Sequence, residues 1–306
     1  MHQNDFLILP HKKISLVGSS YLCPVCGASR SGRTIYSFGS FKVVKCASCS
    51  TIHLAPLPSQ EGIYQLYNTN YFADKRQAHG YLSYRDEERL IKKTYRQRLS
   101  KLKKLYNNSR QFSRIHEIGC ALGYGMEVAH ELFDSEFSGS DISREALHEC
   151  RKRGFSVYQS DLAGHCDIAD SGSIDLVIAF DLIEHLCDIA AFDRWLARNT
   201  APGAVFLLTT PDLDSLWNKI LGKRSPTFKI PQHVVYFTTS TLCRALKSFE
   251  LACAWPDFQY VSWGRLMERL RHGLGMTHQP VPHGQGLSVL VPNGMKLYAF
   301  KKRPQV

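Results

Sequence analysis

The hydrophobic and polar positions follow a strand–helix–strand rhythm from residue 114 onward. Short apolar runs, which are typical of strands, alternate with segments whose apolar residues recur at helical spacing. The expected strands are Arg114–Gly119, Phe137–Ile142, Phe155–Gln159, Ile174–Phe180 and Ala204–Thr209, and the expected helices are Tyr124–Phe133, Arg144–Arg153 and residues 188–199. This alternation predicts an α/β fold in which a doubly wound parallel sheet carries helices on both faces.

The chain before this core predicts one amphipathic helix, which starts near the capping residues Ser83 and Asp86. Its apolar positions are Ile91, Tyr95, Leu99, Leu102 and Tyr106, and the basic residues between them are Lys92, Lys93, Arg96, Arg98, Lys101, Lys103 and Lys104. We therefore expect one face to pack against the core and the other to be strongly basic.

After Pro211 the pattern loosens. A helix is expected near Ser240–Phe249 and a last strand near Met295–Lys301. Between them, residues 262–274 form a short basic amphipathic segment. Such a segment fits a lid, a core-facing helix or a helix that lies on a bilayer surface.

Near the start of the chain, two CxxC pairs are separated by nineteen residues: Cys23, Cys26, Cys46 and Cys49. Short strands are expected around them over residues 21–54. This spacing is typical of a zinc ribbon, in which four thiolates bind Zn²⁺ and leave no position for a reactive water, so the metal is expected to be structural. The alternatives are four free cysteines or a redox-active pair.

The composition predicts a packed, cytoplasmic protein. Of the 306 residues, 44% are hydrophobic, which is enough for a sizeable core. No apolar run approaches the roughly 20 residues that span a bilayer, and the first residues, MHQNDFLILPHKK, contain too short an apolar patch for a secretion signal.

Charge is distributed unevenly along the chain. Residues 1–110 carry a net charge of +12, residues 111–215 carry −11, and residues 216–306 carry +10. The basic flanks predict an anionic partner such as a phosphate, a membrane surface or nucleic acid, although solvated helix faces would explain them equally well.

The stretch IHEIGCALGYG ends an expected buried strand in a glycine-spaced turn. Glu117 precedes this turn, so a bound phosphate is disfavoured and a positively charged ligand group is expected near the carboxylate.

This turn, followed by GSDIS, SDL and DLVIAFDLIEHL, resembles the class I S-adenosylmethionine (SAM)-dependent methyltransferases. That family has a Rossmann-like doubly wound sheet and usually reads D/E-x-G-C-G-x-G at the first motif, where this chain has Ala121 at the second glycine.

The resemblance implies a role for each matching position. It assigns the methionine part of SAM to Glu117 and to the backbone of Gly119, Cys120, Ala121 and Gly123; the ribose hydroxyls to Asp141; the adenine to Ile142, Asp161 and Leu162; and the sulfonium region to Phe180 and Asp181. The acidic central segment suits a sulfonium cation.

The zinc ribbon placed before this core, followed by TPDLDSLWNKILGK and PQHVVYF, resembles a bacterial subgroup that acts on sugars, lipids and other small metabolites. The expected domains are a zinc ribbon and N-terminal segment (1–58), a helical linker or lid (59–110) and a SAM-binding domain (111–306). An acceptor-pocket insertion is expected around 212–285.

Methyl transfer to oxygen, nitrogen or carbon often requires removal of a proton from the acceptor. His185, in DLIEHL just beyond a strand, is the first candidate for the general base, and His233, in PQHVVYF, is the second. Each could instead be a packed or capping residue.

These observations predict a SAM-dependent methyltransferase for a sugar, a lipid-linked or a phosphorylated small molecule, either free in the cytoplasm or peripheral at the membrane surface. One alternative is an RNA methyltransferase, since a zinc ribbon and a basic helix suit a phosphate backbone. The other is a non-catalytic SAM-binding module, which only the Ala121 departure favours.

Overall fold

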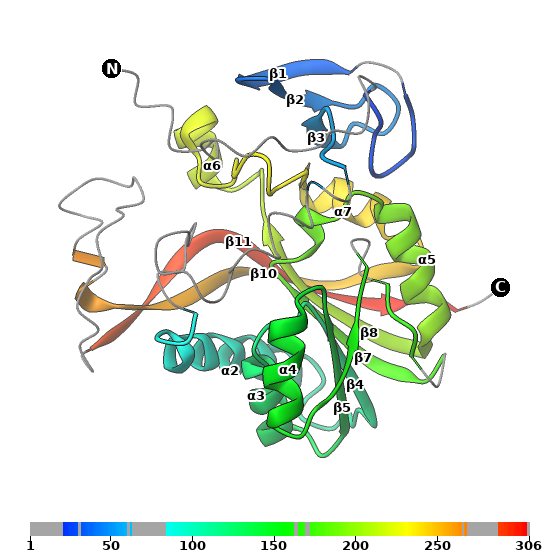
Figure 1. The fold of residues 1–306 in the computed structure, drawn as a ribbon, viewed down its shortest axis with the longest axis vertical. Helices are drawn as coiled ribbons and strands as arrows, with labels where there is room; N and C mark the ends of the chain where they lie inside the picture. The colour runs from blue at the N-terminus through cyan, green and yellow to red at the C-terminus, as the bar shows by residue number, and fades with distance from the viewer. Residues whose placement is uncertain are drawn as a thin grey trace.

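A seven-stranded mixed sheet forms the centre of the computed structural model (Figure 1), which describes residues 21–29, 32–59, 62, 84–161, 165–168, 172–264, 266–267 and 287–304. Five parallel strands lie in the order β8-β7-β4-β5-β6: β4 (Arg114–Ile118), β5 (Glu136–Asp141), β6 (Ser156–Gln159), β7 (Ile174–Phe180) and β8 (Thr200–Pro211). Beyond β8, β11 (Ser288–Lys302) and then β10 (Phe249–Ser262) pair antiparallel. The predicted doubly wound sheet is confirmed.

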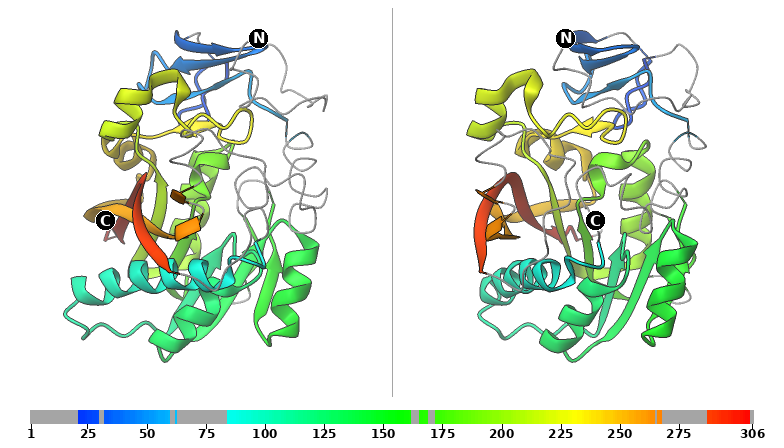
Figure 2. Two further views of the ribbon diagram at one scale, coloured as in Figure 1. Left: turned by 90° about the vertical axis from the view of Figure 1, so that its left-hand side faces the viewer. Right: turned by 60° about the vertical axis from the view of Figure 1, so that its left-hand side comes forward.

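Helices cover both faces of this sheet: α2 (Glu88–Leu105), α3 (Tyr124–Leu132), α4 (Arg144–Lys152), α5 (Ile189–Asn199) and α7 (Thr239–Ala245). Along β7, Leu176 and Ile178 pack in a core with α2 and α3, whereas Val177 and Ala179 pack in a core with α5 and α7. Successive side chains of a strand point to opposite faces, so the near-continuous apolar sequence of β7 supplies both layers. Figure 2 shows helices on both sides of the sheet.

The helix expected after Ser83 and Asp86 is α2, but it begins without a side-chain cap at Glu87. Ser83 lies outside the described residues. Arg98, which the pattern places on the basic face, is instead 3% exposed. The expected division into one packed and one basic face is therefore wrong at this position.

The edge strand β10 is absent from the sequence-based expectations. It contains Pro256, which lies next to a break in the register with β11. Proline is tolerated on edge strands and at bulges because its missing N–H is not required there. The strand expected at Met295–Lys301 forms the second half of β11, and most of the amphipathic segment at 262–274 lies outside the described residues.

The N-terminal part forms a second sheet from β1 (Arg33–Phe38), β2 (Phe41–Lys45) and β3 (Ile52–Ala55). Its fourth strand, β9 (Val235–Tyr236), comes from the chain after β8, where α6 (Leu216–Leu221) and η3 (Gly222–Arg224) also lie. The small sheet lies beside α7 at the top of Figure 1 and shares one continuous apolar core with α5 and α7. The small sheet is therefore anchored to the larger sheet and its helices.

In the part of the chain that the structure describes, no helix is both long and apolar enough to cross a membrane.

Candidate functional site

The glycine turn after β4 folds back against the end of β5. The N–H groups of Gly119 and Cys120 both donate to the carbonyl of Ser140, at 2.7 and 3.0 Å. Gly119 and Gly123 have φ of +75° and +83°, and Ala121 lies at +47°. This left-handed conformation suits glycine and strains alanine, so a local cost accompanies the sequence departure at Ala121.

Glu117, at the end of β4, is buried behind this turn. It is 2% exposed, and neither carboxylate oxygen has a hydrogen-bond partner among the described residues. Burial raises the pKa of Glu117 to about 8, and the nearby charge of Asp141 adds to the effect. A Cβ atom on Gly125 would lie 2.4 Å from Glu117 Oε1, so the bare backbone of Gly125 makes room for the carboxylate.

A cavity of about 230 Å³ opens beyond the carboxyl ends of β4, β5, β6 and β7. Eight of the residues singled out from the sequence line it: Gly119, Ala121, Asp141, Ile142, Asp161, Phe180, Asp181 and His185. Four others do not line it: Glu117, Cys120, Gly123 and His233. Leu162 lies outside the described residues. The edge where strand order reverses is where doubly wound sheets bind their ligands.

Backbone contacts fix the orientation of Asp141 in the cavity wall. Its Oδ2 accepts from the N–H of Ala121 at 2.9 Å, and its Oδ1 accepts from the N–H of Ser143 at 2.8 Å. Burial raises the pKa of this carboxyl group, while these donors lower it. Each carboxylate oxygen has two lone pairs, so Asp141 can still accept from a ligand hydroxyl.

The other two aspartates have different surroundings. Asp161 accepts the backbone N–H of His165 at 2.8 Å and lies 3.2 Å from its ring Nδ1. Asp181 has a φ of +55°, and its N–H donates to Thr209 Oγ1 at 3.1 Å, while the Thr209 hydroxyl donates to its carboxylate. The strained backbone of Asp181 is therefore held by β8.

One buried cation in the cavity wall was missed by sequence reasoning. Arg98, on α2, donates to both carboxylate oxygens of Asp257 on β10, at 3.1 and 2.6 Å. Its guanidinium lies 4.8 Å from the ring centre of Phe180 and 3.9 Å from Asp181. Only the fold could identify this role, because the partner lies on a strand that the sequence does not predict.

Other cavity residues that sequence reasoning missed also come from α2 and β10, or from the segment just before α2: Tyr84, Glu87, Leu90, Ile91, Thr94, Tyr95, Gln259 and Tyr260. Tyr84 stacks on Tyr124, directly after the glycine turn, with ring centres 5.5 Å apart, so this wall of the cavity reaches back to the turn.

The two candidate bases lie against each other. The ring centres of His185 and His233 are 4.7 Å apart with an interplanar angle of 84°. His185 Nδ1 lies 2.9 Å from the carbonyl of Gln232, and His233 Nδ1 lies 2.8 Å from the carbonyl of Thr227. A carbonyl oxygen only accepts, so both Nδ1 atoms carry the proton and both Nε2 atoms carry a lone pair.

Burial lowers the pKa of His185 to about 4 and also lowers that of His233, so both rings are neutral at pH 7. Glu184 precedes His185 in η2 (Ile183–His185) and is 2% exposed. Its Oε2 accepts from Thr210 Oγ1 at 3.0 Å. Burial raises the pKa of Glu184 to about 8, with a further contribution from Asp181.

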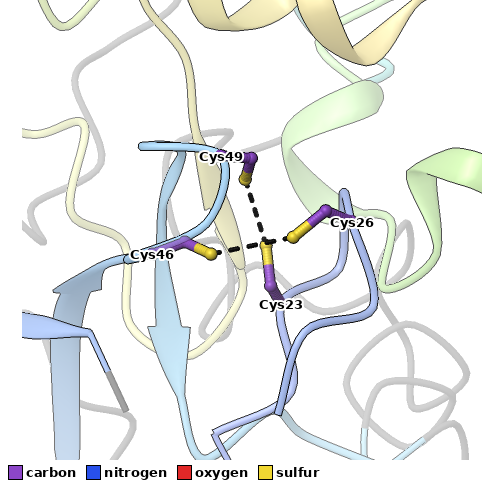
Figure 3. A group of neighbouring side chains, drawn as sticks. All are labelled: Cys23, Cys26, Cys46 and Cys49. Carbon is purple, nitrogen blue, oxygen red and sulfur yellow. Dashed lines mark hydrogen bonds between the residues drawn. The ribbon is translucent and has the colours of Figure 1, made fainter. Parts of the chain in front are cut away.

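The four cysteines of the two CxxC pairs converge, as Figure 3 shows. Sγ of Cys23 lies 3.6 Å from Sγ of Cys49, and Sγ of Cys26 lies 3.7 Å from Sγ of Cys46. These separations are much longer than a disulfide bond and are close to the edge, about 3.8 Å, of a zinc–thiolate tetrahedron. The donor set and its spacing fit a structural Zn²⁺.

Comparison with known proteins gave one family model, described as a methyltransferase domain, which matches residues 81–254. A curated protein of Mycolicibacterium smegmatis, described as a probable S-adenosylmethionine-dependent methyltransferase, is 32% identical over 100 residues. That match covers 31% of this chain and only 37% of the relative.

Solved structures with a similar chain path include a SAM-dependent methyltransferase of Thermotoga maritima, described as a possible histamine N-methyltransferase. It is 13% identical, covers 79% of this chain and 100% of its own, and has a TM-score of 0.48. The YcgJ protein of Bacillus subtilis is 15% identical, with coverage of 68% and 99% and a TM-score of 0.46.

Proposed function

The chain belongs to the methyltransferase-domain family of class I SAM-dependent methyltransferases. From this premise we propose that it transfers a methyl group to a small-molecule acceptor, such as a sugar, a lipid-linked metabolite or a phosphorylated metabolite. The observation that carries the proposal is the cavity at the carboxyl ends of the parallel strands, where Asp141, Asp161 and Asp181 meet a turn with little side-chain bulk.

The residues around this cavity fit SAM. Bound there, SAM supplies a methyl group on a positively charged sulfur. The backbone of Gly119–Gly123, with Glu117 behind it, would hold the methionine part, Asp141 would accept from the ribose hydroxyls, and Phe180 and Asp181 would line the sulfonium region. Adenine would be held by Ile142, Asp161 and Leu162. The carboxylate of Glu117, which has no hydrogen-bond partner among the described residues, supports this fit, because a buried acid of this kind favours a cationic ligand.

We assign removal of the acceptor proton to His185. It lines the cavity, its ring is neutral at pH 7, and the hydrogen bond from Nδ1 leaves the lone pair on Nε2, as a general base requires. His233 packs against His185 without lining the cavity, so in this scheme it positions the base.

The acceptor side is assigned to α2 and to the chain after β8. Tyr95 and Arg98 of α2, together with Gln259 and Tyr260 of β10, line the cavity. We therefore propose that residues 59–110 act as a lid and that the segment around 212–285 shapes the acceptor pocket.

The acceptor is proposed to be anionic or associated with a membrane surface. The flanks carry +12 and +10, and α6 exposes Leu216 and Ile220, at 73% and 68%, beside exposed Lys219. Exposed apolar side chains with basic neighbours suit contact with an anionic surface. The cysteine cluster is proposed to hold a structural Zn²⁺.

Calorimetry with SAM and S-adenosylhomocysteine, followed by labelled-methyl transfer into fractionated lysate and lipid extracts, tests this function. Binding heat is expected for both nucleosides, with label in a small-molecule or lipid fraction. Asp141→Asn should lose the heat, while His185→Ala should keep the heat and lose the transfer. Absence of binding heat for both nucleosides in the metal-replete protein would overturn the proposal. Methyl label found only in RNA would show that the acceptor is RNA and not a small molecule.

A further inference from the structure

We propose that Glu184, His185 and His233 form a second divalent-cation site, distinct from the cysteine cluster. The proposal rests on the proposed function only for the role of the cation, which is to bind and orient an oxygen of the acceptor at the wall of the cavity. Cation binding itself can be measured without any knowledge of the reaction.

The three side chains converge from two segments that are far apart in the sequence. Glu184 and His185 follow β7, whereas His233 precedes β9. One ligand atom from each residue lies within 4.8 Å of the others. A backbone hydrogen bond of 2.8 Å from the N–H of Val234 to the carbonyl of Glu184 holds the two segments together. The arrangement is therefore built into the fold.

Both histidines are oriented as metal-binding histidines usually are. A ligating imidazole typically donates its second ring N–H to a carboxylate or a backbone carbonyl, which fixes the tautomer and the ring direction. Here the Nδ1–H of His185 donates to Gln232 and that of His233 donates to Thr227, at 2.9 and 2.8 Å. The remaining nitrogen of each ring, Nε2, is the one that carries a lone pair.

The burial of the cluster also favours a cation. Glu184 is 2% exposed and His233 is 4% exposed, so solvent screens little of any charge that the cluster carries. A divalent ion held by Glu184 and the two histidines would compensate the charge of this buried carboxylate.

The donor set indicates which ions fit. Two imidazole nitrogens and one carboxylate suit first-row divalent ions such as Zn²⁺, Mn²⁺, Fe²⁺ or Co²⁺, whereas Mg²⁺ prefers oxygen ligands throughout. Three protein ligands leave at least one position open, unlike the four thiolates of the ribbon. His185 is the member that lines the cavity, so this position is accessible to the acceptor. If the site is filled, Nε2 of His185 would hold the cation, which would orient the acceptor oxygen, and direct proton removal by His185 would apply only to the metal-free protein.

Metal content of the full chain, saturated with Zn²⁺ or Co²⁺ and then desalted, tests the proposal. Two cations per chain are expected for the wild type, and one for Glu184→Gln, His185→Ala and His233→Gln. With Co²⁺, intense thiolate charge-transfer bands report the ribbon site, and these variants should retain them. Cys46→Ser should lose the bands and keep the second ion.

Glu184→Gln is the decisive variant because it preserves size and can still accept from Thr210, so its fold should be unaltered by circular dichroism. Its Co²⁺ affinity at the second site should fall by about tenfold or more. His130→Ala, which removes an exposed histidine, is the matched control and should retain both ions. One cation per chain in the saturated wild type, or unchanged affinity in Glu184→Gln, would overturn the site. Neither result would affect SAM binding, so this proposal and the proposed function fail separately.

Discussion

Glu117 shows how one side chain can link folding to ligand binding. It lies against the bare backbone of Gly125, with no hydrogen-bond partner in the described part of the chain for either carboxylate oxygen. Its position at the end of a strand could be predicted from the sequence, whereas its isolation depends on the packing of α2 and α3 around it.

Glu117→Gln should flatten the pH dependence of stability in the cofactor-free protein. Burial raises the pKa of Glu117 from 4.5 to about 8, so the folded state binds a proton over a range where the unfolded state does not. The resulting stabilisation is fully present below 4.5 and is lost as the pH rises through 8. Urea unfolding at several pH values between these limits measures the slope, and equal slopes in variant and wild type would contradict the assignment.

Ala121 provides a second prediction at the residue scale. Its φ of +47° is costly for alanine and free for glycine. Ala121→Gly should therefore stabilise the protein by up to about 1 kcal/mol, partly offset by the greater freedom of glycine in the unfolded chain. Thermal unfolding checks this. Gly154→Ala is the inverse control, because a Cβ atom there meets no atom within 4 Å while φ is +86°, and this variant should be destabilised.

At the scale of elements, the buried ion pair between α2 and β10 holds one wall of the cavity. Arg98→Met should lower the free energy of unfolding by about 3–5 kcal/mol, because it leaves Asp257 buried without its cation. Arg96→Met on the same helix is the matched control. Arg96 pairs with Glu131, but its side chain is 47% exposed, so the loss should be at most about 1 kcal/mol. Similar losses in both variants would show that the burial of the pair is unimportant.

The small sheet is coupled to the candidate bases through β9. β3 pairs with β9, which begins two residues after His233, and the N–H of Ile189 donates to the carbonyl of Pro24 in the first CxxC pair at 2.8 Å. The ribbon therefore supports the segment that carries His233, while the glycine turn and Asp141 lie on other elements.

Cys46→Ser should release the ribbon metal and lower methyl transfer several-fold more than it lowers SAM affinity. The reason is that loss of the metal loosens β9 and His233 but leaves the cofactor residues in place. Metal analysis, calorimetry and labelled-methyl transfer on one preparation measure the three quantities. Cys243→Ser, outside the cluster, is the control and should change none of them. Undiminished methyl transfer in metal-free Cys46→Ser would show that the cysteine cluster does not support the segment that carries His233.

Sequence analysis predicted the helices and strands whose local pattern of apolar residues is clear without knowledge of the tertiary structure. β7 is apolar along nearly its whole length, and α3 and α4 carry a clear helical period. β10 could not be predicted, because Pro256 argues against a strand unless its edge position is known. The two-residue strand β9 exists only because β3 pairs with it. In the site, the order of motifs identified the residues at strand ends, whereas Arg98 was assigned to solvent because its partner was not known.

At the scale of the whole molecule, the acidic central segment contributes most of the cavity carboxylates, and the basic segments lie on either side of it in the sequence. Residues 111–215 carry −11 and include Asp141, Asp161 and Asp181. The net charge of each segment could be predicted from the sequence. The exposure of Leu216 and Ile220 could not, since the LWNKIL stretch of α6 would serve equally well as a buried helix turn.

This surface of α6 should bind anionic vesicles in a salt-dependent way. Leu216 and Ile220 can insert between headgroups while exposed Lys219, Lys223 and Arg224 contact phosphates, each basic residue contributing about 1 kcal/mol. In sedimentation with phosphatidylglycerol vesicles, the double variant Leu216→Ser/Ile220→Ser should bind about tenfold more weakly, and added salt should release the wild type. Neutral phosphatidylcholine vesicles and Leu251→Ser, at an exposed leucine of β10, are the controls. Equal sedimentation of the wild type and the double variant would show that α6 does not contact the membrane. A freely diffusing acceptor would then be the better interpretation.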